Sequence, residues 1–382
     1  MRRIAIIGSN QSKHQRRKAD QNVEDIIYET VRGLLDQASL DIRDVEAVIG
    51  AGDDVLDGRS ISNVFTAEYA GAFLKEESKV EDDGAYAASY AFMRIASGAC
   101  DTALVYGYSK GSDSSPQHYS GMIADPLYLR PLGVEAITAA ALQAQCYFSC
   151  YDVTERQAAL VAVKNRKHAS SNPFAQVSGE LSVEDVMRSP ALAEPIKQLD
   201  ASPVSDGCCA LLLGSEDAVK RFHMKPAWIR GLSFCTDTYY PGHRDLTEIR
   251  SAHTAAERAY KMANIHDPSN EIDFAEIHEP FSFQELMMYE ALGFCGKGEG
   301  GKLVESGATS EGGRLPVNLS GGALSANPIF ATGLIRLAEA AARVAERGGE
   351  GNQKATNAVA HATSGFCLQS NIVYVLSDRS GE

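Results

Sequence analysis

The order of apolar runs and helical patterns in the first half of this 382-residue chain returns in the second half. In the first half, apolar runs lie at 3–8, 45–50, 101–107 and 208–214, and helical patterns at 23–38 and 87–97. In the second half, apolar runs lie at 227–231, 272–278, 358–361 and 372–376, and helical patterns at 255–263, 282–291 and 333–347. Short runs without polar alternation are typical of strands that helices cover on both faces. The repeat therefore predicts an α/β fold, a duplicated βαβαβ unit in five layers, α-β-α-β-α.

The repeat divides the chain into two halves, residues 1–225 and 226–382, and the first half carries an insertion at 110–200. The insertion is rich in Ser, Tyr, Gln and His and has helical patterns of its own. Long insertions on a rigid scaffold either shape a binding pocket or pack against another subunit. Aromatic side chains in and just before it either favour a bulky or aromatic ligand or fill the core: Tyr106, Tyr108, Tyr119, Tyr128, Tyr147 and Phe148.

The charge of the chain argues against nucleic-acid and membrane binding. The 36 Lys and Arg against 50 Asp and Glu give a formal net charge of −14, which repels phosphate backbones and anionic lipids. No apolar run reaches the roughly 18–20 residues of a membrane helix, and no signal-peptide pattern precedes the first strand. The eight Cys form no CxxC pair. We therefore expect a cytoplasmic protein without a metal site or a disulfide framework.

Three segments at the ends of predicted strands carry candidate site residues. His278 ends an apolar run and precedes a helix, where a His either binds a ligand carbonyl or satisfies the helix N-terminus. Gly321 and Gly322 lie in a glycine-rich loop that either approaches a ligand closely or forms a tight turn. His361 and Cys367 follow another buried strand and either form an acid/base pair or are unrelated.

Together with the turn at 205–210, which reads S-D-G-C-C-A, these segments resemble the thiolase superfamily. The similarity is greatest to sterol-carrier-protein thiolases and related acyl-CoA acetyltransferases. Residues 165–169 and 172–176 resemble the family's NHxxA and NPxAQ segments, and 278–281 (H-E-P-F) its oxyanion-hole motif. The resemblance implies the five-layered fold, a homodimer or a heterodimer with a homologue, a coenzyme A thioester as substrate and no covalently bound cofactor.

Two departures from the family pattern bear on chemistry. Asn327 stands where the family has the His of a Gly-His-Pro motif, and an amide does not accept a proton near neutral pH. The family's nucleophilic cysteine is missing, since residues 80–87 read V-E-D-D-G-A-Y-A and no thiol lies between Val80 and Ser97. Asp82 and Asp83 are more typical of helix caps than of acyl acceptors. A covalent acyl-enzyme formed by this chain alone is therefore not expected.

Three functions follow from this pattern. The first is a retro-aldolase that splits a β-hydroxyacyl-CoA, with His278 as oxyanion donor, Asn327 as polar partner, and His361 as base or proton carrier. Tyr86 is a further catalytic candidate, and Phe281, Gly321 and Gly322 are candidates for substrate binding. Similarity to such aldolases implies a small zinc-ribbon/OB-fold partner subunit. The second function is a non-catalytic subunit of a hetero-oligomeric thiolase. The third is a thiolase whose nucleophile is Cys367 or comes from another chain.

Overall fold

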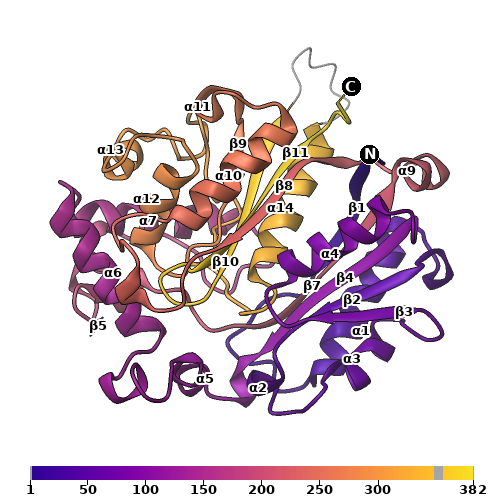
Figure 1. Cartoon of the computed structure of the whole chain (residues 1–382), viewed down its shortest axis with the longest axis horizontal. Helices are drawn as coiled ribbons and strands as arrows, with labels where there is room; N and C mark the ends of the chain where they lie inside the picture. The colour runs from indigo at the N-terminus through magenta and orange to yellow at the C-terminus, as the bar shows by residue number, and fades with distance from the viewer. Residues whose placement is uncertain (1, 348–355, 382) are drawn as a thin grey trace.

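A nine-stranded mixed sheet is the centre of the computed structural model, which describes residues 2–347 and 356–381 (Figure 1). The strands are β1 (Ile4–Gln11), β2 (Ala47–Ala51), β3 (Glu76–Val80), β4 (Thr102–Lys110), β7 (Asp206–Ser215), β8 (Ala227–Thr236), β9 (Phe274–Glu276), β10 (Asn357–Ser364) and β11 (Ser370–Ser377). Their order across the sheet is β3-β2-β4-β7-β1-β8-β11-β10-β9.

The sheet is made of two related halves that join at β1 and β8. These two strands pair antiparallel through Ala5 opposite Trp228 and Ile6 opposite Ala227. On one side, β2 and β4 are parallel and β7 is antiparallel to its neighbours β4 and β1. On the other side, β9 and β10 are parallel and β11 is antiparallel to β10 and β8. The duplication predicted from the sequence is therefore confirmed.

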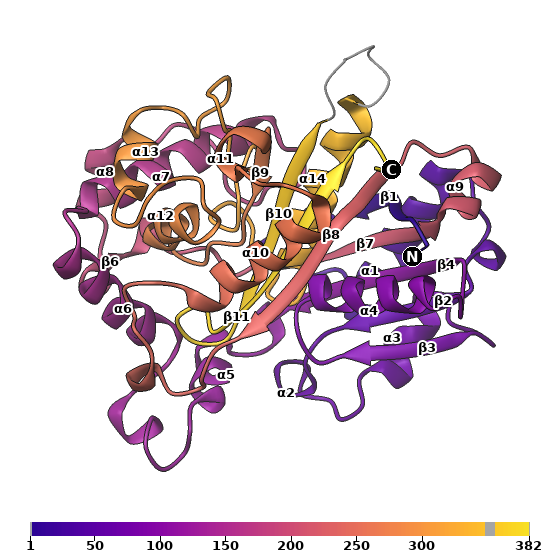
Figure 2. The same ribbon diagram turned by 45° about the horizontal axis from the view of Figure 1, so that its top comes forward.

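Helices cover both faces of each half and meet between the halves (Figures 1 and 2). The helices are α1 (Val23–Ala38), α2 (Asp54–Asp57), α3 (Asn63–Tyr69), α4 (Gly84–Ala96), α5 (Pro116–Ile123), α6 (Ala136–Cys150), α7 (Glu155–His168), α8 (Val183–Arg188), α9 (Glu216–Phe222), α10 (Arg250–Ala263), α11 (Pro268–Glu271), α12 (Ser282–Ala291), α13 (Gly300–Glu305) and α14 (Thr332–Arg347). Helices α4 and α14 contact each other and the strands of their own halves.

Three buried apolar clusters fill the spaces between the layers. One joins α1 to the outer face of the first half, and one joins α4 and α14 to the inner faces of both halves. The third joins α10 and α12 to the outer face of the second half. Burial of apolar surface is the main favourable contribution to folding, so these clusters hold the layers together. The order α1, first half, α4 with α14, second half, α10 with α12 is the predicted five-layered arrangement.

The insertion forms a helical layer beside the second half. Helices α6 and α7 share the apolar cluster of α10 and α12, and α8 packs against α7. A short ribbon of two strands, β5 (Ala191–Ala193) and β6 (Ile196–Lys197), follows α8. Figure 2 shows α6, α7 and α8 beside α12 and α13. The insertion thus packs mainly against the half that follows it in the chain.

Strand β9 is shorter than the sequence pattern predicts, and its early end positions the candidate site. The apolar run extends over 272–278, but only Phe274–Glu276 pair in the sheet. The Ile277 N–H instead donates to the side chain of Asn318 (2.6 Å), and the His278 N–H donates to the carbonyl of His361 (3.2 Å). The chain therefore leaves the sheet with the backbone N–H groups of Ile277 and His278 both bonded.

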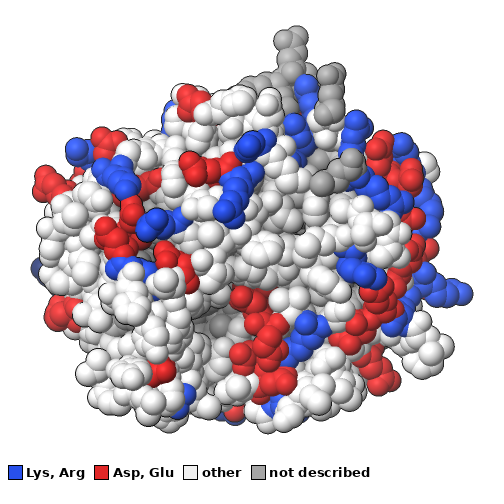
Figure 3. Space-filling view, viewed as in Figure 1, with Lys and Arg blue, Asp and Glu red and all other residues white. Residues whose placement is uncertain are grey.

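The surface carries the excess of acidic side chains. Figure 3 shows them gathered below the centre of one face, beside a hollow in the surface. In the described ranges, no helix combines the length and the apolar character that crossing a bilayer requires.

Candidate active site

A cavity of about 400 Å³ lies where the chain leaves the carboxyl ends of β3, β9 and β10. Ligands of α/β folds bind at this edge of a sheet. The insertion supplies part of the wall through α5 and the start of α6, and the segment before α14 supplies another part. Most of the lining side chains are apolar. Polar side chains from several elements lie among them, an arrangement suited to binding and orienting a largely apolar ligand.

His278 lies in the wall of this cavity. Its side chain is 6% exposed, and its buried Nδ1 has no hydrogen-bond partner among the described residues. Burial lowers the pKa of His278 well below its usual value, and the nearby His361 and Arg336 add to the effect. The imidazole is therefore neutral near pH 7, and a neutral imidazole still donates one N–H. An unpartnered, neutral ring is suited to donate to the oxygen of a bound ligand.

His361 lies in β10 behind the wall rather than in it. Its Nε2 is 2.9 Å from Oδ1 of Asn371, while Nδ2 of Asn371 donates to the carbonyl of Leu368 (2.8 Å). Because Asn371 thus presents an acceptor, His361 donates from Nε2, and its Nδ1 is an unpartnered acceptor. Burial lowers the pKa of His361 to about 4, so this ring is also neutral.

Two consecutive carboxylates, Asp82 and Asp83, lie in the cavity wall at the start of α4. Asp83 accepts from the N–H of Ala85 (2.8 Å) and from the N–H of Gly333 (2.8 Å), so one carboxylate caps both central helices. Burial raises the pKa of Asp83 to about 7, although these N–H groups oppose the shift. The sequence pattern predicted a cap here, and Asp83 is one. It did not predict that the cap belongs to the cavity.

No cysteine is found at the start of α4, in the segment that resembles the family's nucleophile turn. The helix begins Gly84-Ala85-Tyr86, and the Gly84 N–H donates to the carbonyl of Phe330 (2.8 Å). A Cβ at position 84 would lie 2.8 Å from Cβ of Leu334 in α14. Because that contact is too close for any side chain, the packing of the two central helices excludes a thiol from position 84.

Cys367 is the one cysteine in the wall of this cavity. Its thiol is buried and donates to the carbonyl of Ala139 (3.3 Å). Burial raises the pKa of Cys367 to about 11, and the nearby Arg244 lowers it only in part. The reactive form of cysteine is the thiolate, which is rare at neutral pH when the pKa is this high. The thiol therefore lacks the activation that a nucleophile requires.

Alkylation tests this conclusion directly. We expect iodoacetamide at pH 7.5 to modify the exposed Cys146 and Cys150 well before Cys367, because the first two thiols are exposed to solvent and Cys367 is buried. Peptide mass spectrometry over a time course measures the order. Fast modification of Cys367 before Cys146 would show an activated thiol and contradict the conclusion.

Asn327 and Phe281 also lie in the cavity wall. The side chain of Asn327 is already bonded on both sides, since its Nδ2 donates to Ser202 (2.8 Å) and its Oδ1 accepts from Thr332 (2.6 Å). It is therefore held in one orientation. The predicted residues that the structure brings together in one cavity are His278, Asn327, Phe281 and Cys367.

Gly321 and Gly322 do not line the cavity. They have φ angles of +98° and +66° and form a tight turn against the side chain of Glu279, the residue after His278. Glu279 is buried, accepts from Asn165 (3.0 Å) and from the N–H of Leu324 (3.2 Å), and has its pKa raised to about 8, first by burial. Gly322 thus makes room for a carboxyl group of the protein, behind the wall, and Gly321 makes room for the side chains of Ser325 and Ala169.

Tyr86 lies in α4 with its hydroxyl donating to Ser370 (2.9 Å), and it is not among the lining residues. Of the aromatic residues noted in and before the insertion, Tyr119 lines the cavity. Tyr106, Tyr108 and Tyr147 are buried in the core, and Tyr128 is exposed. The aromatic content of this region therefore serves mainly the core.

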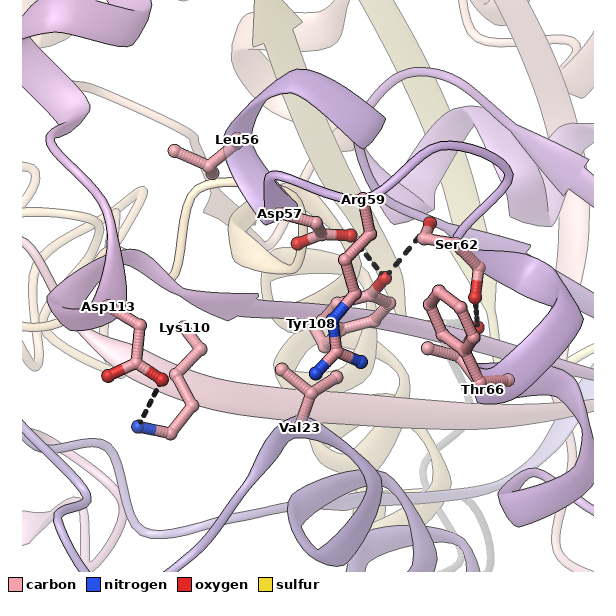
Figure 4. Close-up of a pocket in the computed structure, with 10 residues that line it drawn as sticks. Val23, Leu56, Asp57, Arg59, Ser62, Thr66, Tyr108, Lys110 and Asp113 are labelled. Carbon is pink, nitrogen blue, oxygen red and sulfur yellow. Dashed lines mark hydrogen bonds and ion pairs between the residues drawn. The ribbon is translucent and has the colours of Figure 1, made fainter.

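A second, smaller cavity of about 130 Å³ lies near the start of α1 (Figure 4). Its charged groups already have partners. Tyr108 donates to Asp57 (2.6 Å), and Lys110 is 3.0 Å from Asp113. Arg59 forms an ion pair with Glu24, which Figure 4 does not draw. Since no charged group remains to meet a ligand, the cavity with His278 is the better candidate site.

Comparisons with known proteins agree with the fold and the motifs. A family profile described as "Thiolase C-terminal domain-like" matches residues 234–378. An acetyl-CoA acetyltransferase of Methanothermobacter thermautotrophicus is 32% identical over 349 residues, 89% of this chain and 90% of that protein. The benzoylsuccinyl-CoA thiolase subunit BbsB of Thauera aromatica is 32% identical over 235 residues, 60% of each chain. A solved structure named Ltp2-ChsH2(DUF35) aldolase has a TM-score of 0.81 at 24% identity, over 99% of this chain and 98% of the other.

Proposed function

Because the chain belongs to the thiolase superfamily, we propose that it cleaves a carbon–carbon bond of a β-hydroxyacyl-CoA by a retro-aldol reaction, without a covalent cysteine intermediate. The observation that carries the proposal is the start of α4, where Gly84 packs against Leu334 and no thiol is present. A thioester bound in the cavity would meet carboxylates and a neutral imidazole instead. Those groups are suited to proton transfer and oxyanion stabilisation rather than to acyl transfer.

The proposed reaction conserves atoms and electrons without a redox partner. A base removes the proton of the β-hydroxyl group, and the bond between Cα and Cβ breaks as an aldehyde or ketone forms. The bonding electrons move into the thioester enolate, which a proton at Cα converts to the shorter acyl-CoA. His278 donates its N–H to the thioester oxygen, where negative charge develops. The backbone N–H of His278 donates to the backbone carbonyl of His361, so we assign His361 a role in positioning His278.

The names of similar proteins fit this proposal and also favour assembly with a different subunit. The aldolase structure above is named for two components, Ltp2 and ChsH2(DUF35), and the relative from Thauera aromatica is named as a subunit. We therefore propose that the chain works in a hetero-oligomer, with a homologue or with a small DUF35-type subunit. A non-catalytic role in such a complex is the second candidate, because the family's nucleophile is missing. A measurement of turnover distinguishes the retro-aldolase from the non-catalytic subunit.

The test uses 3-hydroxy-3-phenylpropionyl-CoA, which would give benzaldehyde and acetyl-CoA. The chain is purified alone and together with any subunit that co-purifies from expression with its neighbouring genes. We expect benzaldehyde, detected by its absorbance, in a one-to-one ratio with acetyl-CoA and without free CoA. Addition of iodoacetamide should leave the rate unchanged, because no thiolate takes part.

Two results would contradict the proposal. Release of free CoA in step with product would indicate acyl transfer or hydrolysis rather than retro-aldol cleavage. Absence of benzaldehyde from both preparations, with a co-purified homologue that carries a reactive cysteine, would favour the non-catalytic role.

A further inference from the structure

The retro-aldol reaction needs a base in the cavity wall, and His361 lies behind that wall. The cavity is lined by three carboxylates, Asp82, Asp83 and Glu135, and by no Lys or Arg among the described residues. We propose that Asp82 is the catalytic base that removes the β-hydroxyl proton and returns it to Cα. This assignment rests on the proposed function and adds to it a residue of the turn that replaces the family's nucleophile.

Two of the three carboxylates are fully engaged in capping helices. Glu135 accepts from the N–H groups of Thr138 (2.8 Å) and Ile137 (3.1 Å) at the start of α6. Asp83 uses one oxygen for α4 and the other for α14, and it is only 2% exposed. Moving either group toward a substrate would leave backbone donors unsatisfied, which costs about 1–3 kcal/mol for each buried group.

Asp82 is the carboxylate that can accept a further hydrogen bond from a ligand. Its Oδ1 accepts from the N–H of Asp83 (2.7 Å), which fixes the orientation of the group. Among the residues that the structure describes, its Oδ2 accepts only from the hydroxyl of Ser364 (3.2 Å), and Ser364 itself lines the cavity. A hydroxyl rotates easily, and each carboxylate oxygen has two acceptor sites, so Oδ2 can accept a proton from a bound hydroxyl group.

The wall of the same cavity also contains His278, the proposed donor to the thioester oxygen. His278 is more than nine-tenths buried, and its ring has no hydrogen-bond partner among the described residues. An unpartnered buried nitrogen in a cavity wall indicates that a ligand supplies the missing partner. Burial also raises the pKa of Asp82, which makes its conjugate acid easier to form and so favours uptake and return of a proton.

In this assignment, Asp82 takes up one proton and returns it in each catalytic cycle. The Asp82 carboxylate takes the proton of the β-hydroxyl group as the bond between Cα and Cβ breaks. The carbonyl product leaves, and the enolate remains bound through its oxygen to His278. The protonated Asp82 then donates its proton to Cα, which restores the carboxylate. No oxidant, reductant or covalent intermediate is required.

The test compares the wild-type protein with Asp82→Asn, using the same chain preparation and 3-hydroxy-3-phenylpropionyl-CoA. Removal of a general base lowers rates by about 100- to 10,000-fold, so we expect at least a 100-fold lower kcat. The melting temperature should stay within about 2 °C, since Asn keeps the acceptor for the Asp83 N–H. Asp185→Asn is the matched control, because Asp185 caps α8 outside the cavity. This variant should keep the wild-type rate.

A second measurement separates failure of the base from failure of the proposed substrate. Incubation of acetyl-CoA with the protein in D₂O reports proton exchange at Cα, which needs the base and the oxyanion donor alone. Exchange that depends on Asp82, without benzaldehyde release, would support the base and refute the β-hydroxyacyl substrate. Benzaldehyde release by Asp82→Asn at more than a third of the wild-type rate would refute the base and leave the retro-aldol function standing. Absence of both reactions from the wild-type protein would refute both proposals.

Discussion

Replacement of His278 by Leu is expected to lower the rate of carbon–carbon cleavage about 100- to 1000-fold, the usual loss when one oxyanion donor is removed. Leu has a similar volume and no hydrogen-bonding group. Since the buried Nδ1 of His278 has no protein partner, the substitution breaks no side-chain hydrogen bond of the described fold. We therefore expect no loss of thermal stability. Benzaldehyde release and a melting curve measure the two effects.

The control for this prediction is His253→Leu. His253 lies on α10 outside the cavity, with its side chain largely exposed to solvent. This variant should keep both activity and stability. If His278→Leu retained more than a tenth of the wild-type rate, His278 would not be the main oxyanion donor. If His278→Leu lost activity together with stability, the loss would reflect the fold rather than the chemistry.

Replacement of Gly322 by Ala is expected to cause the largest loss of stability. At φ +66° a side chain costs about 1–2 kcal/mol by itself. A Cβ at this position would also lie 1.9 Å from Oε1 of Glu279, so the turn or the carboxyl group must move. Such overpacking costs a further amount of about 1–3 kcal/mol. We therefore expect a total loss of about 3 kcal/mol in the free energy of unfolding, measured by denaturant titration.

Gly307→Ala is the matched control for the effect of backbone conformation. Gly307 has φ +75°, and nothing lies within 4 Å of a Cβ at that position. This variant should show only the cost of the left-handed conformation, about 1–2 kcal/mol. Equal losses in the two variants would mean that the contact with Glu279 contributes nothing, and would contradict the role given to the glycine turn.

Much of the fold could be predicted from the sequence because most elements are buried on a regular face. Helices α1 and α12 have the bounds that their apolar periodicity indicates. Strand β3 was not predicted, because its sequence Glu-Glu-Ser-Lys-Val has no apolar run. It is a strand because it pairs with β2 at the edge of the sheet, from Ala47 opposite Glu76 to Ala51 opposite Val80. Such an edge depends on tertiary pairing that local pattern does not record.

The candidate site was predictable where a residue follows the end of a buried strand. His278 and Cys367 follow β9 and β10, and both line the cavity. His361 lies within β10 instead, because the strand extends to Ser364. For Gly321 and Gly322, the sequence shows that space is needed but not which group occupies it. Asp82 and Asp83 were interpreted as a cap, and the second role of this turn becomes visible only when the cavity beside it is known.

The shared cap at Asp83 also bears on how the chain could change its chemistry. One carboxylate ties together the central helices of both halves, and Leu334 fills the space beside Gly84. Restoring sulfur at position 84 would require a new side chain and a smaller neighbour in α14. No single codon change supplies both. An engineered thiol at this position would therefore need a paired substitution at Leu334.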